Sequence, residues 1–272
     1  IGDVRDLPRL IKAMEDVDIV YHAAALKHVP VVEYNPFEAI KTNVLGSQNV
    51  IDACLHENIE TVVCVGTDKA VSPLNTYGAT KLLMEKLFVT ASNYTNRERH
   101  KTKFIAIRYG NVLGSSGSVV PTLLKQIESG RNITITDPNM TRFNITMNQA
   151  LDFIIRSSKK GNGGEVFIPK LKAYSLGILK EAILEVLEKD VKTELISVRP
   201  GEKYHESLIS SEEIRNTFED KDDYVILEDS LQNNIKTKKS TLTNQYSSDV
   251  VECLTKKELK KILIEEKLVS TK

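Results

Sequence analysis

The sequence predicts an α/β protein with a doubly wound parallel sheet, followed by a smaller mixed α/β lobe. Three observations predict this. Short apolar strands alternate with helical stretches over residues 1–110. After Gly114 the pattern of expected secondary structure changes, and short strands and helices follow one another less regularly. The chain has 272 residues, 41% hydrophobic and 27% charged, which is ordinary for a globular protein of one large domain and an appendage.

The first part contains strand and helix patterns in alternation. Aliphatic and β-branched runs predict strands, and longer stretches with apolar residues at helical spacing predict helices. Strands are expected at 18–24, 61–66 and 103–110, and helices at 35–56 and 76–92. Pro36 suits the first turn of its helix, where a missing N–H costs little. Helical crossovers between such strands are right-handed, which predicts a parallel sheet covered on both faces.

The second part reads as the smaller lobe, with a polar stretch and a terminal helix. Helices are expected at 119–130, 147–159 and 175–189, and strands at 133–136, 164–169 and 193–198. Residues 212–248 are polar and predict a surface excursion with one strand at DYVILE. The tail LTKKELKKILIEE predicts an amphipathic helix that docks on this lobe, with Thr255 as N-cap before Glu258.

Composition excludes several function classes. Lys plus Arg equals Asp plus Glu at 37 each, so we expect neither nucleic acid nor an acidic membrane surface as a partner. Cys54, Cys64 and Cys253 are widely spaced, which argues against disulfides or a metal site and favours the cytoplasm. No run approaches the roughly 18 apolar residues of a membrane span. The chain opens mid-motif at Ile1, so we expect the true N-terminus, and whatever it carries, upstream.

A YxxxK motif is the first candidate for chemistry. Tyr77 and Lys81 lie one helical turn apart, at the start of a helix that follows a strand. A phenol titrates near pH 10, and a neighbouring ammonium is expected to lower its pKa so that it can accept a proton. Tyr and Lys at this spacing are common on solvated helix faces. The position near the carboxyl end of a strand, where α/β sheets bind ligands, favours the functional interpretation.

Thr67, Asp68 and Lys69 stand together at the end of that same strand. A polar loop with a local ion pair would explain an arbitrary TDK tripeptide. Beside YxxxK, an acid/base pair is the better hypothesis.

Four further segments are candidates for binding. HAAALKH (22–28) offers small residues at a strand end, although helix packing would explain it equally. GNVLGSSGS (110–118) does not fit GxGxxG and predicts a loop that cradles a ligand. Arg199 in RPGE, and Arg142 in MTRF, could bind a diphosphate through a planar guanidinium, although a surface turn is the plain alternative for RPGE.

Six segments together resemble one family. They are GDVRD, HAAALKHVPVVEYNPFEAIKTNVLGSQNVIDAC, TDKAVSPLNTYGATK, RYGNVLGSSGSVVP, ITITDPNMTRF and VRPGEKYHE. They are similar to the inverting UDP-N-acetylglucosamine 4,6-dehydratases of the polysaccharide-biosynthesis branch of the extended short-chain dehydrogenase/reductase family. The resemblance runs from residue 1 to about residue 266 and is most specific up to residue 145.

The resemblance implies roles for individual residues. The implied catalytic residues are Asp68, Lys69 and Tyr77, with Lys81 supporting the tyrosine. The implied cofactor-binding residues are Asp3 (at the adenine), Val4, Ala23, Ala24, Ala25, Asn43, Thr67, Tyr77, Lys81 and Val112. The implied substrate-binding residues are Lys27, Lys69, Asn111, Val119, Arg142, Arg199 and Glu202, the last two at the UDP end.

The resemblance also implies a domain plan and partners. Residues 1–118, with parts of 140–170, would be the remainder of a Rossmann-like NADP-binding domain that lacks its first strands. Residues 119–272 would mainly form the substrate lobe, interleaved with it. The glycine fingerprint and the residue that separates NADP from NAD would lie upstream, so the isolated chain should bind NADP weakly. UDP-N-acetylglucosamine and a homo-oligomeric partner are expected.

The implied reaction is dehydration with inversion at C5, toward a pseudaminic acid-like surface glycan. Tyr77 would deprotonate O4, Lys69 would remove H5 and Asp68 would protonate the departing 6-hydroxyl. Two alternatives stay open. A 4- or 5-epimerase of the same fold would need Tyr77 and Lys81 but not the Asp–Lys pair. A catalytically silent nucleotide-sugar-binding member would need no turnover.

Overall fold

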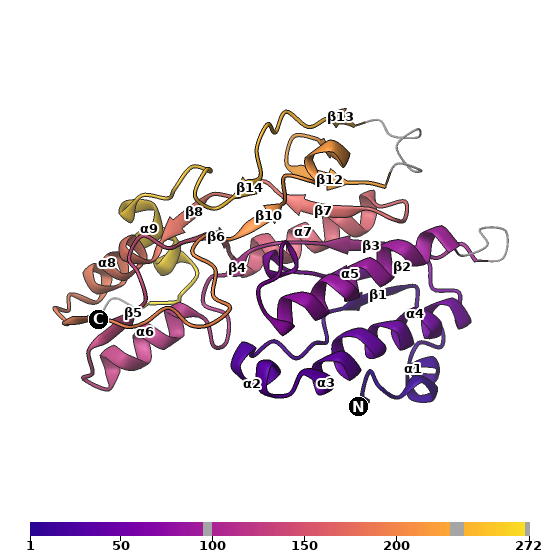
Figure 1. Cartoon of the computed structure of the whole chain (residues 1–272), viewed down its shortest axis with the longest axis horizontal. Helices are drawn as coiled ribbons and strands as arrows, with labels where there is room; N and C mark the ends of the chain where they lie inside the picture. The colour runs from indigo at the N-terminus through magenta and orange to yellow at the C-terminus, as the bar shows by residue number, and fades with distance from the viewer. Residues whose placement is uncertain (95–99, 229–236, 270–272) are drawn as a thin grey trace. The chain divides into compact units, whose positions relative to one another are not determined.

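The computed structural model describes residues 1–94, 100–228 and 237–269, and the chain divides into two compact units. Unit 1 comprises residues 1–109, 151–170 and 207–245. Unit 2 comprises residues 110–150, 171–206 and 246–272. Each unit is built from segments that are far apart in the sequence (Figure 1).

Unit 1 contains the principal sheet, whose strand order is β1-β2-β3-β7-β12-β11-β13. The first four strands are parallel, and they are β1 (Ile19–His22), β2 (Thr61–Val65), β3 (Lys103–Ile107) and β7 (Val166–Pro169). The last three add antiparallel partners, and they are β12 (Asp223–Ile226), β11 (Thr217–Glu219) and β13 (Lys238–Lys239). The parallel α/β fold predicted from the sequence is confirmed.

Helices cover both faces of this sheet. The first part of the chain supplies α1 (Leu7–Ala13), α2 (Val29–Tyr34), α3 (Pro36–Ala39), the π-helical turn η1 (Ile40–Leu45), α4 (Gly46–His56) and α5 (Thr76–Tyr94). On one face, Phe88 of α5 packs edge-on against Phe104 of β3, with ring centroids 6.1 Å apart. On the other face, Phe153 of α7 (Met147–Lys160) packs in a cluster with Ile105 and Ile107 of the same strand. Successive residues of β3 therefore serve opposite faces.

Two expectations about this sheet differ from the structure. The pattern of strands and helices placed the strand at 164–169 in the smaller lobe, although the domain plan implied by the resemblance gave parts of 140–170 to the larger domain; β7 pairs in parallel with β3 in the principal sheet. Residues 212–248 were expected to be a surface excursion, but β11, β12 and β13 extend the same sheet. The predicted strand at DYVILE is confirmed as β12, which pairs antiparallel with β7. A short 3-10 turn, η3 (Ile214–Asn216), links β10 (Ser207–Ile209) to β11.

Unit 2 is a smaller mixed lobe. Its strands are β4 (Asn111–Val112), β5 (Ile133–Ile135), β6 (Thr141–Ile145), β8 (Ala173–Ser175), β9 (Thr193–Leu195) and β14 (Tyr246–Ser247). Its helices are α6 (Val119–Glu128), α8 (Leu176–Leu187) and α9 (Lys256–Glu265). Strands β4, β6 and β8 form one sheet, and β5 pairs with β9. The sequence did not predict β4, β6 or β8.

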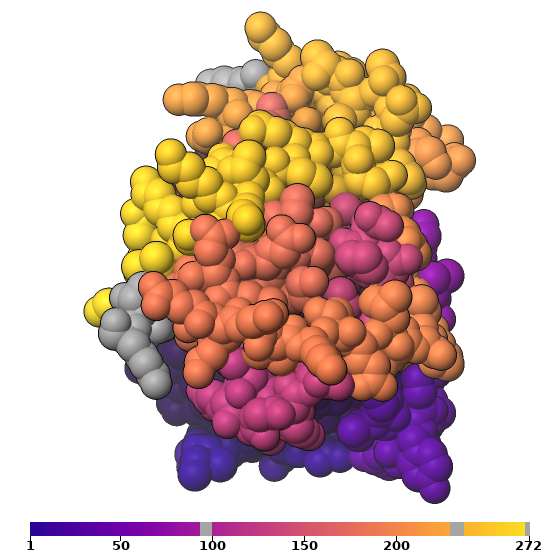
Figure 2. Space-filling view, turned by 90° about the vertical axis from the view of Figure 1, so that its left-hand side faces the viewer, coloured from indigo at the N-terminus to yellow at the C-terminus, as the bar shows by residue number. Residues whose placement is uncertain are grey.

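The terminal helix α9 packs against α8, and Figure 2 shows both on one face, in yellow and coral. Leu259 and Leu263 of α9 are fully buried in a cluster with Leu179 and Ile183 of α8. The predicted N-cap is confirmed. The Thr255 hydroxyl accepts from the Glu258 N–H at 3.2 Å, and the Glu258 carboxylate accepts from the Thr255 N–H at 2.8 Å.

Candidate active site

The Thr67–Asp68–Lys69 segment is fixed where β2 ends. Gly66 N–H donates to the Ile107 carbonyl at 2.8 Å, and Asp68 N–H donates to the Tyr109 carbonyl at 3.2 Å. Gly66 is required here because any Cβ would collide with that Ile107 carbonyl oxygen. The chain then turns through the 3-10 helix η2 (Asp68–Ala70). The backbone of β3 thus sets where the candidate acid/base pair lies.

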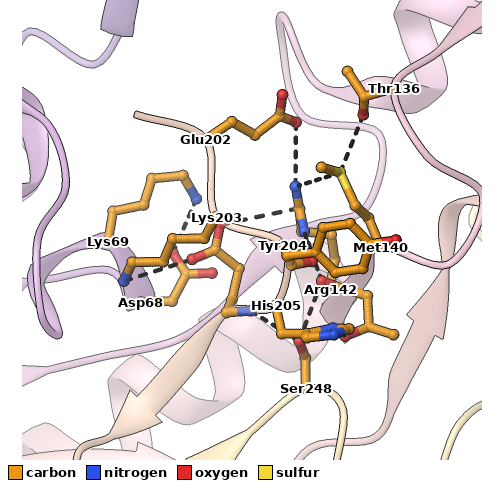
Figure 3. A network of polar contacts seen from close by, with 12 residues as sticks. Asp68, Lys69, Thr136, Met140, Arg142, Glu202, Lys203, Tyr204, His205 and Ser248 are labelled. Atoms are coloured by element: carbon orange, nitrogen blue, oxygen red, sulfur yellow. Dashed lines mark hydrogen bonds and ion pairs between the residues drawn. The ribbon is translucent and has the colours of Figure 1, made fainter. Parts of the chain in front are cut away.

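Asp68 and Lys69 form an ion pair. The Lys69 ammonium donates to Asp68 Oδ1 at 3.0 Å (Figure 3). The Thr67 hydroxyl donates to the same oxygen at 2.8 Å. Asp68 is fully buried, while 27% of the Lys69 side chain is exposed. Asp68 Oδ2 is buried and has no hydrogen-bond partner among the described residues. One carboxylate oxygen is therefore shared between two donors, and the other is unsatisfied.

Tyr77 lies on the first turn of α5, which packs directly on η2. Gly78 makes this contact possible, because a Cβ at this position would overlap the Lys69 carbonyl oxygen and lie 3.0 Å from Pro73 Cβ. Asn75 Oδ1 accepts from the Gly78 N–H at 2.8 Å and so caps the helix start. The sequence separates Lys69 from Tyr77 by a loop, and the structure brings their backbones into contact.

Burial raises the pKa of Tyr77, and the Lys69 cation opposes this shift. The expectation that the pKa of Tyr77 is lowered was therefore wrong, because burial outweighs the neighbouring cation. Lys81 is 3% exposed and points inward, donating to the Val65 carbonyl at 2.7 Å and to Met84 Sδ at 3.1 Å. Burial in turn lowers the pKa of Lys81. Lys69 of the TDK segment is thus a cation that acts on the phenol, in addition to the YxxxK lysine that the sequence suggested.

The small-residue segment after β1 is held by Asn43. Ala23 and Ala24 are exposed, and Ala25 is half-buried. Asn43, in the π-helical turn η1, accepts from the Leu26 N–H at 2.7 Å and donates to the Leu26 carbonyl at 3.1 Å. It also donates to the Thr80 hydroxyl at 3.0 Å. Asn43 therefore connects the segment that includes exposed Lys27 to α5.

The N-terminal GDVRD segment carries an exposed carboxylate. Asp3 pairs with Arg5 at 2.7 Å, and this hydrogen bond lowers the pKa of Asp3 to about 2. The Val4 carbonyl accepts from Asn49 Nδ2 of α4 at 3.0 Å. Asp3 is therefore an ionised acceptor at neutral pH, held near the start of α4.

In unit 2, strand β6 carries Arg142 within a polar cluster (Figure 3). Arg142 contacts Glu202 at 3.2 Å and donates to the Thr141 and Tyr204 carbonyls at 2.7 and 3.1 Å. The Arg199 N–H donates to Glu202 Oε2 at 3.3 Å, within the RPGE turn. The structure thus joins Arg142, Glu202 and Arg199 through one carboxylate.

The other candidates in unit 2 flank its short sheet. Asn111 and Val112 form β4 and pair in parallel with Asn144 and Ile145 of β6. Val119 is the first residue of α6 and is half-buried. Asn111 and Val112 thus lie at the start of the GNVLGSSGS segment, and Val119 follows its last residue.

Sequence reasoning missed several polar residues. Ser248 hydrogen-bonds the Thr141 hydroxyl at 2.7 Å, and His205 Nδ1 lies 2.7 Å from that same hydroxyl. In unit 1, Arg108, Glu85 and Glu213 form a buried charged cluster. Two of these were detectable, since Arg108 interrupts the apolar strand KFIAIRYG and Glu85 lies one turn beyond Lys81.

Two absences hold for the parts of the chain that the structure describes. No group of three or more His, Cys, Asp or Glu side chains is placed to hold a metal ion. Across residues 1–94, 100–228 and 237–269, no helix is both long and apolar enough to cross a membrane.

The fold and the relatives named below are those of an enzyme of the short-chain dehydrogenase/reductase type. The dTDP-glucose 4,6-dehydratase of Streptomyces venezuelae, solved with NAD, shares this fold with a TM-score of 0.68 at 19% identity, over 75% of this chain and 68% of that one. The chain belongs to the polysaccharide biosynthesis protein family, whose model matches residues 1–228.

Relatives of higher sequence identity have names that describe different activities. An inverting UDP-N-acetylglucosamine 4,6-dehydratase of Campylobacter jejuni is 48% identical over 83% of this chain, which spans 66% of that relative. An uncharacterised membrane protein of Methanocaldococcus jannaschii is 44% identical over 97% of this chain and 80% of its own length. A UDP-glucose 4-epimerase of Rickettsia massiliae is 38% identical over 97% of this chain and 79% of its own length. The structure of Pen from Bacillus thuringiensis matches with a TM-score of 0.91 and 40% identity, over 99% of this chain and 81% of that one.

Proposed function

We propose that this chain catalyses NADP-dependent 4,6-dehydration of UDP-N-acetylglucosamine with inversion at C5, as a cytoplasmic lyase acting as a homo-oligomer. The observation that carries the proposal is the Asp68–Lys69 ion pair at 3.0 Å, held against the first turn of the Tyr77 helix. The 48% identity to an enzyme of that name supports the choice of substrate.

Three side chains divide the proton transfers. Tyr77 takes the proton from O4, assisted by the nearby Lys69 cation, which opposes the effect of burial on the phenol. A proton first passes from the Lys69 ammonium to the carboxyl group of Asp68 across their 3.0 Å contact, which leaves a neutral amine beside a carboxylic acid. The Lys69 amine then removes H5, which the 4-ketone has acidified. Asp68 delivers its proton to the departing 6-hydroxyl, which leaves as water, and Oδ2, which has no partner among the described residues, is the oxygen available to carry that proton.

Several residues suit a dinucleotide cofactor. Ala23 and Ala24 are exposed at the carboxyl end of β1 and have no side chain beyond Cβ, so a ligand can approach their backbone closely. Asp3 offers an ionised acceptor for the adenine amine. The proposed set is completed by Val4, Ala25, Asn43, Thr67, Tyr77, Lys81 and Val112. NADP, when bound, supplies the hydride acceptor for C4 and the hydride donor for C6.

Unit 2 is proposed to bind the nucleotide. Arg142 and Arg199 would hold the diphosphate, and Glu202, which joins them in this structure, would meet the UDP end. Asn111, Val119 and Lys27 are proposed to contact the sugar nucleotide.

A UDP-sugar 4-epimerase is the second candidate, because the Rickettsia massiliae relative of that name matches 97% of this chain. Mass spectrometry separates the two. The purified protein, with UDP-N-acetylglucosamine and NADP, should give a product lighter by one water, and in heavy water that product should carry deuterium at C5. Interconversion of UDP-glucose and UDP-galactose without loss of water would establish the epimerase instead. No turnover of either substrate, with binding retained, would indicate a silent binder.

A further inference from the structure

A cluster of three charged side chains includes Glu85 of α5, and its Arg108 and Glu85 members are buried while Glu213 is partly exposed. Arg108 follows β3 and is 1% exposed. Its Nε and Nη2 atoms each donate to the Glu85 carboxylate at 2.6 Å. Its Nη1 and Nη2 atoms donate to the Glu213 carboxylate at 3.0 and 2.7 Å, and Nη1 also donates to the Leu208 carbonyl at 3.1 Å. These bonds engage the five N–H donors of a guanidinium.

The cluster has a net charge of −1, because two carboxylates face one guanidinium. Burial alone would lower the pKa of Arg108, but Glu85 and Glu213 outweigh this effect and raise it. Burial likewise would raise the pKa of Glu213, but Arg108 outweighs this effect and lowers it. Arg108 and Glu213 therefore stay charged, and a fully buried carboxyl group such as Glu85 is stabilised by cations nearby.

Lys81 is the buried cation closest in sequence, one helical turn before Glu85. Its ammonium donates hydrogen bonds to two neutral acceptors, the Val65 carbonyl and Met84 Sδ. The titratable groups that face it are Glu85 on its own helix, Cys64 on β2 and His22 on β1. Burial lowers the pKa of Lys81, while Cys64 and Glu85 oppose that shift. Its charge is felt at His22, whose pKa burial and Lys81 together lower to about 4.

We propose that Glu85, locked by Arg108 against Glu213, is a positioning residue that supplies the counter-charge for Lys81 and keeps its ammonium protonated. The proposal rests on the proposed function only for the part in which Lys81 supports redox chemistry at Tyr77. Arg108 fixes the Glu85 rotamer through two bonds, so the counter-charge cannot swing away from the helix face that carries Lys81.

A purely mechanical role is the competing explanation. Arg108 also ties α5 to the 207–216 segment, because Glu213 accepts from the Ser210 N–H at 2.9 Å and from its hydroxyl at 3.0 Å. Strand β10 of that segment in turn contacts η2. If the cluster were only a clamp, either carboxylate would matter equally, and the protonation of Lys81 would not depend on which one is changed.

Glu85→Gln and Glu213→Gln form a matched pair that separates these explanations. Each replaces one bidentate partner of Arg108 with an amide of the same shape, but only Glu85 lies one turn from Lys81. We expect Glu85→Gln to move the alkaline limb of the pH profile of cofactor reduction down by about one to three pH units, the range for loss of an opposite charge at about 4–6 Å. Glu213→Gln should leave that limb within a few tenths of a unit. Equal shifts in both variants, or a shift in neither, would overturn the proposal.

A direct titration of Lys81 in the parent protein depends neither on whether the variant folds nor on whether the reaction proceeds. The Lys81 side chain of the parent protein can be followed by NMR through its ¹³Cε signal, assigned by its disappearance in Lys81→Arg. We expect Lys81 to remain protonated throughout the neutral range in the parent, and to lose its proton at lower pH in Glu85→Gln. A Lys81 that is already neutral at pH 7 in the parent would refute the counter-charge role, even if Glu85→Gln does not fold. If the protein converts no UDP-sugar, the proposed function fails while this titration still decides the role of Glu85.

Discussion

Gly78→Ala tests whether the contact between η2 and α5 sets the geometry of the candidate site. The new Cβ would overlap the Lys69 carbonyl oxygen and lie 3.0 Å from Pro73 Cβ, whereas ordinary contact begins at 3.4 Å. Because the obstacle is backbone, the Lys69 turn and the Tyr77 helix must separate by roughly 1 Å, a displacement that can cost about 100-fold in catalytic rate. Overpacking costs about 1–3 kcal/mol, and Ala gains about 1 kcal/mol over Gly in a helix, so we expect a net loss of roughly 0–2 kcal/mol.

The assay for Gly78→Ala combines denaturant unfolding with single-turnover cofactor reduction and water loss. Gly161→Ala is the matched control. Its Cβ would lie 2.6 Å from Ile105 Cγ2, a side-chain atom, and none of the candidate site residues is among its nearest neighbours. We expect the control to lose stability while its turnover per folded molecule stays normal. Normal turnover in Gly78→Ala would show that the close approach does not set the site.

Three further substitutions have expected outcomes. Tyr77→Phe should lose most turnover but still bind UDP-sugar, and in the parent the oxidation rate should rise with pH because burial raises the pKa of this base; near-normal activity would refute the assignment. Lys69→Met should abolish exchange of H5 with solvent deuterium, and it should slow but not abolish transient cofactor reduction, because the cation that opposes the effect of burial on Tyr77 is lost; undiminished exchange would exclude Lys69 as the base. Thr255→Ala should lower the free energy of unfolding by about 1 kcal/mol through loss of the capping box with Glu258, measured against Lys257→Ala, which should change it little.

Local patterns were sufficient for the elements near the candidate site. Alternating strands and helices predicted β1, β2, β3 and α5, and the Thr255–Glu258 spacing predicted the cap of α9. These features depend on residues within a few positions of one another, so the sequence alone determines them.

Long-range pairing could not be predicted in the same way. The apolar run that forms β7 fits any buried strand, and nothing in it names β3 as its partner. Strand β12 was predicted, but its place beside β7 depends on Asp223, which is fully buried and accepts from Arg156 at 2.6 Å and from Lys160 at 3.0 Å. These cations lie more than 60 positions away, so DYVILE read alone resembled an isolated surface strand.

Sequence reasoning identified the residues of the candidate site but not their electrostatics. YxxxK suggested that Lys81 acts on Tyr77, because the two share a helix face. The structure instead turns Lys81 toward the Val65 carbonyl and brings Lys69 near the phenol. The position of Lys69 near Tyr77 depends on the close approach of the backbone at Gly78. A spacing rule within a single helix cannot predict a contact of this kind.

The burial and the incomplete hydrogen bonding of Asp68 favour acid/base chemistry over a structural ion pair. A loop carboxylate that only paired with Lys69 could lie at the surface, where both oxygens would be solvated. Asp68 is instead fully buried, and its Oδ2 atom lacks a hydrogen-bond partner among the described residues. An unsatisfied buried acceptor costs about 1–3 kcal/mol, a cost that an ion pair with Lys69 alone does not explain. A 4-epimerase would use Tyr77 without requiring this arrangement, whereas a dehydratase needs an acid beside the base. The proposal of a dehydratase rather than an epimerase therefore rests on this buried, half-satisfied carboxylate.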